Sequence, residues 1–311
     1  MTTERNGLTR QGFLGGALAA VALGGGGAAA QEPRPAGALH RRPIPASGET
    51  LPVIGLGTWR GFDVGEAAAE RAPLREVVAT LLDRGGRVID SSPMYGRAEA
   101  VAGDLVAGLD ARDRTFLATK VWTSGREAGI AQMNRSFRLL RTGRLDLMQI
   151  HNLLDWRTHL PTLRAWKEEG RIRHLGISHY TESAYDAVEA VLRAERLDFL
   201  QINYALDDRA AEERLLPLAA ERGVAVLVNR PFGGGGLLRR LAHRPLPDYA
   251  AELGCASWGE ILLKFVIGHP AVTCAIPGTA DPRHMAENLR AGTGPLPDAT
   301  LRRRMAATLP A

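Results

Sequence analysis

The chain has 311 residues, of which 45% are apolar, enough to bury one large core or two ordinary ones. Its 39 basic and 34 acidic residues give a formal net charge of +5, and no basic run is interleaved with aromatic residues, which argues against nucleic-acid binding. Two cysteines, Cys255 and Cys274, are too few for a disulfide framework, and their spacing fits no metal site. An exported protein could pair the two, but Cys274 lies inside the apolar run of residues 271–276, so we expect a buried free thiol there.

The first thirty residues have the layout of a signal peptide. Arg5 and Arg10 precede an uncharged stretch rich in glycine, alanine and leucine, residues 12–30, which ends in three alanines. This stretch is only weakly apolar, so we expect no membrane span. The segment around Arg10 resembles a twin-arginine export signal, although Gln11 replaces the second arginine. Residues 1–30 thus predict export to the periplasm, with an uncleaved cytoplasmic tail as the alternative.

Residues 31–50 predict a linker and the start of a hairpin. The segment is rich in proline, arginine and serine, and Ser47-Gly48-Glu49 can turn the chain before the apolar run that begins at Leu51.

From residue 51 onward the chain repeats one pattern, a buried-type apolar run followed by a segment of helical periodicity. The runs begin near residues 53, 87, 115, 145, 172, 198, 225 and 272. A helical stripe is formed by Leu74, Val77, Val78, Leu81 and Leu82. Eight such units predict an α/β fold, a single-domain (β/α)8 TIM barrel over residues 51–311, with the N-terminal hairpin as a lid on its floor.

Two local features predict details of this barrel. Pro161 fits the first turn of a helix, and Gly170 fits the position just past the end of that helix. The stretch from Gly233 to Cys255 lengthens the seventh unit and contains four consecutive glycines. We expect it to form a lid or ligand clamp among the C-terminal mouth loops, or else a flexible surface loop.

Four residues capable of acid–base chemistry stand at the ends of three neighbouring strands. Asp90 ends the second apolar run and Tyr95 follows it, Lys120 closes the third and His151 the fourth. Parallel barrels keep their active sites at these strand ends, so we expect the four side chains to meet. A buried lysine needs a charged partner, for which Asp90 is the candidate, and a nearby ammonium lowers the pKa of Tyr95 from about 10. Taken alone, Asp90 could instead cap a helix.

With these four positions the sequence resembles the aldo-keto reductase superfamily over residues 50–292. Asp90, Tyr95, Lys120 and His151 fall on the four catalytic positions of the family. The resemblance implies reduction of an aldehyde or ketone to an alcohol by hydride from NAD(P)H, with Tyr95 as general acid and His151 orienting the carbonyl. It also implies a cofactor extended across the barrel mouth, and indeed no G-x-G-x-x-G motif opens a βαβ unit.

The same resemblance implies the positions that bind the cofactor. Ser178 and Gln201 match the residues that hold the nicotinamide carboxamide, whereas His179 replaces a common asparagine and Asn229 replaces an aromatic residue that stacks on the nicotinamide. Arg230 could hold the pyrophosphate or form a structural ion pair. The implied cofactor-binding residues are Ser178, His179, Gln201, Asn229, Arg230, Phe232, Gly233, Gly278, Thr279, His284 and Asn288.

The choice between NADP(H) and NAD(H) depends on the cofactor-binding residues between positions 278 and 288. Gly278 replaces a lysine and His284 an arginine of the family, which removes two cations from the 2′-phosphate site, although Arg283 is adjacent. Thr279 can still bind a phosphate and Asn288 the adenine. NADP(H) is the family expectation, and NAD(H) is the alternative.

Other residues near strand ends are candidates for contacts with a small-molecule carbonyl substrate. Trp59, Trp122 and Trp156 could wall the substrate cavity or simply pack there, and Asn152 could orient His151 or bind substrate. The resemblance suggests a monomer or small oligomer.

Two other functions are compatible with parts of this pattern. A metal-dependent barrel hydrolase also uses aspartate and histidine at strand ends, but the first strand lacks an H-x-H pair and carries Gly55-Leu-Gly-Thr58 instead, so we expect no metal. A cofactor-binding regulatory or sensing protein on a reductase scaffold, with little turnover, would agree with the replacements His179 and Asn229.

Overall fold

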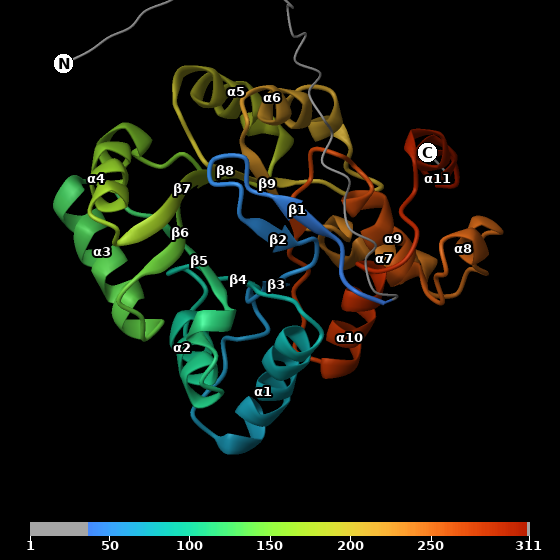
Figure 1. The fold of residues 1–311 in the computed structure, drawn as a ribbon, viewed down its shortest axis with the longest axis horizontal. Helices are drawn as coiled ribbons and strands as arrows, with labels where there is room; N and C mark the ends of the chain where they lie inside the picture. Colours follow the sequence, from blue (N-terminus) through green and yellow to red (C-terminus); the bar gives the residue numbers. More distant parts are fainter. Residues whose placement is uncertain (1–36, 310–311) are drawn as a thin grey trace, which may run out of the picture. The chain divides into compact units, whose positions relative to one another are not determined.

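Eight parallel strands lie at the centre of the protein in a computed structural model that describes residues 37–309 (Figure 1). The predicted signal peptide, residues 1–30, lies outside the described residues. The strands are β3 (Leu56–Gly57), β4 (Val88–Asp90), β5 (Phe116–Val121), β6 (Leu145–His151), β7 (Ile172–Ser178), β8 (Phe199–Asn203), β9 (Ala225–Asn229) and β10 (Cys274–Ala275). Each begins within three residues of its predicted start.

The strands pair in the order of the sequence, and each is parallel to the next. Isolated bridges between Ile54 and Ala275 and between Gly57 and Gly278 join the first strand to the last. All seven residues of β6 are buried, as expected for a strand covered on both faces. The predicted (β/α)8 TIM barrel is confirmed.

Helices connect successive strands and cover the outside of the barrel (Figure 1). They are α1 (Ala68–Asp83), α2 (Ala98–Gly108), α3 (Arg126–Leu139), α4 (Trp156–Glu168), α5 (Tyr185–Ala194), α6 (Leu215–Glu221), α9 (Trp258–Ile267) and α10 (Pro282–Ala291), and α11 (Ala299–Ala307) follows them. The predicted apolar stripe of α1 is buried at all five positions.

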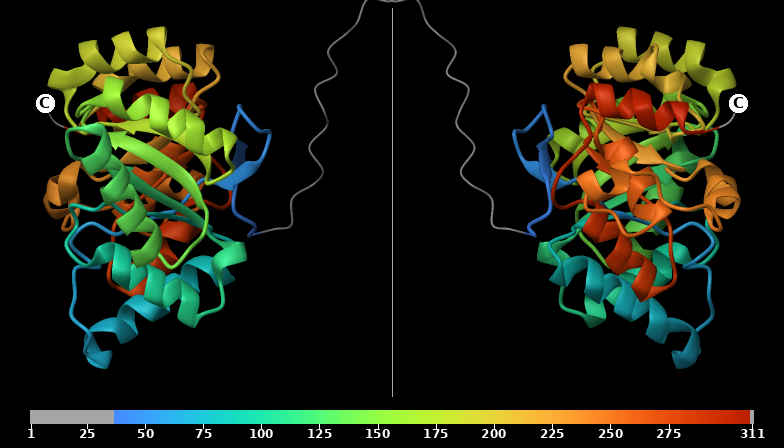
Figure 2. Two further views of the ribbon diagram at one scale, coloured as in Figure 1. Left: turned by 90° about the vertical axis from the view of Figure 1, so that its left-hand side faces the viewer. Right: turned by 90° about the vertical axis from the view of Figure 1, so that its right-hand side faces the viewer.

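The N-terminal hairpin closes the floor of the barrel, as predicted. It pairs β1 (Arg41–Pro43) with β2 (Thr50–Pro52) in antiparallel register, and Gly48 has a positive φ of 72° in the turn. Ile44 and Leu51 are fully buried in one cluster with the first residues of several barrel strands, among them Val88 and Phe116. Figure 2 shows the hairpin, in blue, at one end of the barrel.

The prediction that Pro161 begins a helix is wrong. α4 begins five residues earlier, at Trp156, directly after Asp155 in the left-handed region. The Asp155 carboxylate accepts hydrogen bonds from the Gly125 backbone N–H and from the Thr158 hydroxyl. These bonds of Asp155, one of them to the loop before α3, fix the start of the helix, and the proline does not.

The stretch from Gly233 to Cys255 is helical rather than an open loop. It contains η4 (Gly233–Gly235), α7 (Gly236–Leu241) and α8 (Tyr249–Glu252), and α7 packs beside α9 (Figure 1). Leu237, Leu241 and Tyr249 are buried. A lid or clamp role for this stretch stays a prediction.

Both cysteines are buried and free, which confirms the buried thiol expected at Cys274. Within residues 37–309, no helix is long and apolar enough to cross a membrane.

Candidate active site

The four predicted catalytic side chains lie at the C-terminal end of the barrel. Asp90 is the last residue of β4, Lys120 the last but one of β5, and His151 the last of β6, while Tyr95 follows β4 in the loop before α2. Because parallel strands end at the same edge of the barrel, three neighbouring strands bring these residues to one mouth.

A buried ion pair between Lys120 and Asp90 forms the centre of the site. The Lys120 ammonium nitrogen lies 2.6 Å from Asp90 Oδ2 and 2.7 Å from the Ser91 carbonyl oxygen, and Lys120 is fully buried. The other carboxylate oxygen, Oδ1, accepts hydrogen bonds from Gln149 Nε2 at 3.1 Å and Gln201 Nε2 at 2.9 Å. Asp90 is therefore the partner that the buried lysine requires, as predicted.

The charge on Lys120 is maintained by its neighbours. Burial by itself lowers the pKa of Lys120, but Asp90, together with Tyr95 and Glu99, outweighs this effect and raises the pKa above its ordinary value. Lys120 thus carries a positive charge at neutral pH beneath the barrel mouth.

Tyr95 is held against this cation. Its ring centroid lies 5.4 Å from the Lys120 ammonium nitrogen, and its side chain is half-buried against the core. Burial raises the pKa of Tyr95, and although Lys120 lowers it, the net direction is upward. The expectation that Lys120 brings the Tyr95 pKa below its ordinary value is therefore wrong for this structure, because loss of solvent outweighs the nearby charge.

His151 is buried in its neutral form. Its Nδ1 atom lies 2.7 Å from the Ser178 hydroxyl, and burial, together with Lys120, lowers the pKa of His151 to about 3. If Ser178 donates to Nδ1, the proton of the imidazole is on Nε2, where it can be donated to another oxygen.

Two residues expected at the nicotinamide contact predicted catalytic side chains here. Ser178 binds His151, and Gln201 donates to Asp90. Next to them, the Asn229 side chain donates to the His179 carbonyl oxygen at 2.9 Å, and His179 Nδ1 accepts from the Tyr180 backbone N–H. Asn229 Oδ1 is buried with no partner among residues 37–309.

Arg230 lies at the start of the glycine-rich stretch. It adopts a positive φ of 51°, as do Gly233, Gly234 and Gly235 at 56°, 69° and 88°. Its guanidinium lies 5.9 Å from the Tyr180 ring centroid and forms no ion pair with any residue that the structure describes, so a structural ion pair is not its role within 37–309. Phe232 is half-buried against the core.

The predicted adenosine-phosphate residues lie between β10 and the end of α10. Gly278 bridges Gly57, and the Thr279 hydroxyl accepts from the Asp281 backbone N–H at 3.0 Å. His284 is exposed and Asn288 is buried, both on α10. The neighbouring cation, Arg283, is paired with Asp281 at 2.7 Å.

The predicted substrate residues differ in how far they are exposed to solvent. Trp59 and Trp122 are 53% and 40% exposed, whereas Trp156 is half-buried against the core. Asn152 adopts a positive φ of 55°, and its Oδ1 is buried without a partner in the described chain. It is Ser178 that contacts the His151 ring.

Two residues of the site were missing from the sequence-based set. Tyr180 is 41% exposed, and its ring is nearly parallel to those of His151 and His179, at centroid distances of 6.2 and 5.8 Å. Gln149 holds Asp90 from β6. Its position two residues before His151 could have revealed it, because alternate residues of a strand share a face.

Comparison with known proteins identifies one family. Residues 53–306 match the sequence model of the Aldo/keto reductase family. The chain is 29% identical over 259 residues to methylglyoxal reductase YeaE of Escherichia coli, covering 80% of this chain and 89% of that protein. It is 26% identical over 263 residues to an NADH-specific methylglyoxal reductase of the same species, covering 73% and 78%.

A solved structure agrees with these matches. The crystal structure of an aldo-keto reductase from Klebsiella pneumoniae in complex with NADPH has a TM-score of 0.70 and 28% identity, covering 84% of this chain and 92% of that chain. All four side chains at the barrel mouth lie inside the matched family segment.

Proposed function

The chain belongs to the aldo/keto reductase family and is an NAD(P)-dependent oxidoreductase, and we propose that it reduces an aldehyde or ketone to an alcohol with NADPH, using Tyr95 as general acid. The observation that carries this proposal is the buried Lys120–Asp90 pair directly beside the Tyr95 ring. A charged lysine at this position stabilises the phenolate that forms when the phenol of Tyr95 gives up its proton.

The residues at the mouth fit a dinucleotide cofactor. Among residues 37–309, Asn229 offers a buried oxygen without a partner, which suits an amide donor, and Arg230 offers a guanidinium without an ion pair, beside glycines that a phosphate can approach closely. Ser178, His179 and Gln201 would hold the nicotinamide end, and Thr279, His284 and Asn288 the adenosine end. When bound, the cofactor supplies a hydride to the carbonyl carbon.

Side chains of the protein would donate the proton and orient the carbonyl oxygen. The raised pKa keeps the Tyr95 phenol protonated at neutral pH, so its proton is available to the oxygen. The Lys120 ammonium then stabilises the phenolate that remains, and Asp90 keeps the ammonium in place. Neutral His151, fixed through Nδ1 by Ser178, can donate from Nε2 to the same oxygen and orient it.

We propose NADP(H) rather than NAD(H) because a related structure was solved with NADPH. Arg283 is paired with Asp281, so a 2′-phosphate would rely on Thr279 and His284 instead. We therefore expect only a moderate preference for NADPH over NADH. One relative is named as NADH-specific, which makes the comparison of both cofactors necessary.

Export is also a proposal, and it rests on residues 1–30 alone. Fractionation of the native host should place the protein in the periplasm with a mature N-terminus near residue 31. Detection of the full-length chain in the cytoplasm alone would contradict it.

The test of the activity uses protein lacking residues 1–30. NADPH oxidation should depend on an aldehyde or ketone, and Tyr95→Phe should lower kcat by about 100-fold or more while NADPH binding, followed by fluorescence, is unchanged. Tyr249→Phe, which removes a hydroxyl bonded to Thr308 far along the chain, is the matched control and should retain full activity.

Two other results would contradict parts of this proposal. NADPH binding without turnover of any carbonyl compound would favour the regulatory or sensing alternative. Full activity of Tyr95→Phe would exclude Tyr95 as the acid.

A further inference from the structure

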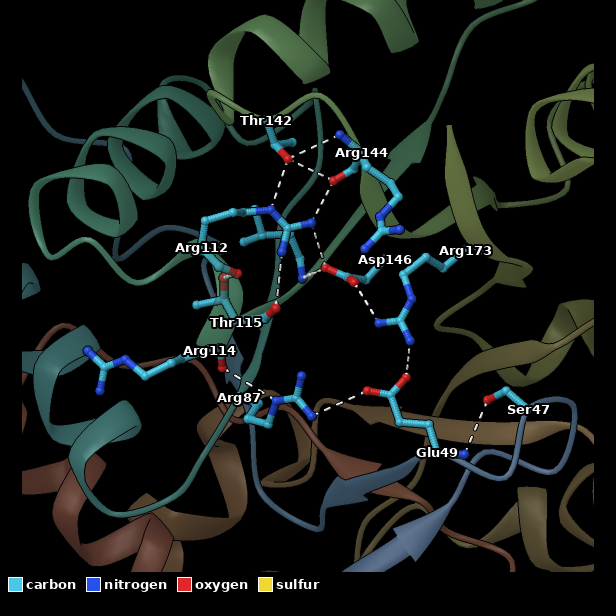
Figure 3. A network of polar contacts seen from close by, with 11 residues as sticks. Ser47, Glu49, Arg87, Arg112, Arg114, Thr115, Thr142, Arg144, Asp146 and Arg173 are labelled. Atoms are coloured by element: carbon cyan, nitrogen blue, oxygen red, sulfur yellow. Dashed lines mark hydrogen bonds and ion pairs between the residues drawn. The ribbon is translucent and has the colours of Figure 1, made fainter. Parts of the chain in front are cut away.

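A polar cavity lies at the floor of the barrel, at the opposite end from Tyr95. It has a volume of about 240 Å³ and is lined chiefly by Arg87, Arg112, Thr142, Arg144, Asp146 and Arg173 (Figure 3). Arg87, Arg112 and Arg144 precede β4, β5 and β6, and Arg173 is the second residue of β7. We call this space the floor cavity.

One buried carboxylate organises the floor cavity. Asp146 Oδ2 accepts from the Leu117 backbone N–H at 2.8 Å and pairs with Arg112 at 3.0 Å, and Oδ1 accepts from Arg173 at 2.9 Å. Both oxygens of Asp146 are therefore occupied. Their bonds hold the Arg112 and Arg173 guanidinium groups on either side of the carboxylate (Figure 3).

A second carboxylate comes from the hairpin. Glu49 pairs with Arg87 at 3.3 Å through one oxygen and with Arg173 through the other (Figure 3). Glu49 thus ties the hairpin to the starts of β4 and β7. Its oxygens, like those of Asp146, are already bound to arginine.

The floor cavity retains an excess of positive charge and of donors. Its four lining arginines face three carboxylates, those of Glu49, Asp113 and Asp146, and Asp113 is exposed without an ion pair in the described chain. The Arg144 guanidinium forms no hydrogen bond or ion pair with any residue between 37 and 309, and Figure 3 shows it turned toward Asp146 and Arg173. Arg173 uses only two of its five N–H donors in the contacts above.

We propose that the floor cavity binds a phosphate group, either as inorganic phosphate or as a small phosphate monoester. A phosphate brings up to two negative charges and several acceptor oxygens, which matches Arg144, unpaired within the described part of the chain, and the spare donors of Arg173. The ligand would bind next to the arginines that hold Glu49, so it would brace the hairpin against the barrel. The site is independent of the carbonyl chemistry proposed at the mouth.

The test is a phosphate titration at constant ionic strength, followed by the midpoint of thermal unfolding. Because a ligand of the folded state stabilises it, the midpoint should rise and saturate with phosphate but not with chloride. Arg144→Ala should weaken the apparent affinity about tenfold or more, since a charge-assisted contact is lost. Arg84→Ala, at an exposed arginine at the end of α1, is the matched control and should respond like the wild type.

A second variant separates the floor from the mouth, where Arg230 could also meet phosphate. Arg230→Ala should keep the saturable rise. Loss of the response in Arg230→Ala with an unchanged response in Arg144→Ala would overturn the proposal, as would the absence of any saturable rise. Calorimetric titration of the wild type, Arg144→Ala and Arg144→Lys at one temperature measures the same affinities without unfolding. Tighter binding of glycerol phosphate than of inorganic phosphate would identify the ligand as a monoester.

Discussion

At the scale of single residues, the site depends on a lysine charge that has no access to water. Lys120 is fully buried, and Asp90 compensates it while Gln149 and Gln201 donate to the second oxygen of Asp90. A buried pair of this kind stabilises little by itself, but removal of one partner leaves an uncompensated charge. The pair therefore couples the chemistry proposed at the mouth to the stability of the barrel.

We predict that Asp90→Asn lowers the free energy of unfolding by about 3 to 5 kcal/mol and also abolishes most reductase activity. The amide that replaces the carboxylate cannot balance the Lys120 ammonium. Urea unfolding, monitored by circular dichroism, measures the stability.

The double variant Asp90→Asn/Lys120→Met is the control for this explanation. It removes both charges, so it should be more stable than Asp90→Asn while remaining inactive. If the double variant is no more stable than the single one, the uncompensated charge is not the cause.

At the scale of elements, α2 and α3 approach each other at a glycine. A Cβ atom built on Gly103 of α2 would lie 2.1 Å from the Leu139 carbonyl oxygen and 2.7 Å from the Leu140 Cα atom. Both of these are backbone atoms, so a side chain at position 103 would push the two helices apart. The last residue of the same helix, Gly108, has no atom within 4 Å of such a Cβ.

We predict opposite effects of the same substitution at these two glycines. Gly103→Ala should lower the free energy of unfolding by about 1 to 3 kcal/mol through overpacking. Gly108→Ala should be neutral or should stabilise by up to about 1 kcal/mol, because alanine favours the helix. Equal effects in urea unfolding would show that the close approach of α2 and α3 is not present in solution.

At the scale of the whole molecule, two histidines at separate places are held in neutral form, His151 buried and His269 half-buried. Burial lowers the pKa of His151 to about 3 and that of His269 to about 4. Around His269, the Arg302 and Arg42 charges also lower the pKa, and Glu212 raises it. In the unfolded chain both imidazoles titrate near pH 6.5.

We predict that the protein loses stability as the pH falls from about 6.5 to 4. In this range the unfolded chain binds protons that the folded chain does not, so the free energy of unfolding decreases by at most about 1.4 kcal/mol per pH unit for each histidine. His269 contributes less to this decrease in the free energy of unfolding because its imidazole is partly solvated. Urea unfolding between pH 7 and pH 4 measures the slope, and His269→Gln should reduce it. A flat profile would contradict the prediction.

Local pattern was sufficient to predict the barrel. Strand starts and the buried stripe of α1 follow from apolar periodicity, which a few neighbouring residues determine. The order of Asp90, Lys120 and His151 at three successive strand ends was also sufficient to predict that they meet, because parallel topology fixes which ends lie together. The lysine–aspartate pair was predictable for the same reason.

By itself, the sequence determined the fold, the family resemblance and the residues at the mouth, since these depend on residue type and spacing along the chain. Tertiary structure alone decided that burial raises the Tyr95 pKa, that Ser178 contacts His151 and Gln201 contacts Asp90, and that Tyr180 lies beside the histidines. It also decided the start of α4 and brought together the arginines of the floor cavity, which come from the segments before β4, β5 and β6 and from β7. These features depend on the distances between side chains far apart in sequence and on how far packing excludes water from them. The local sequence pattern determines neither quantity.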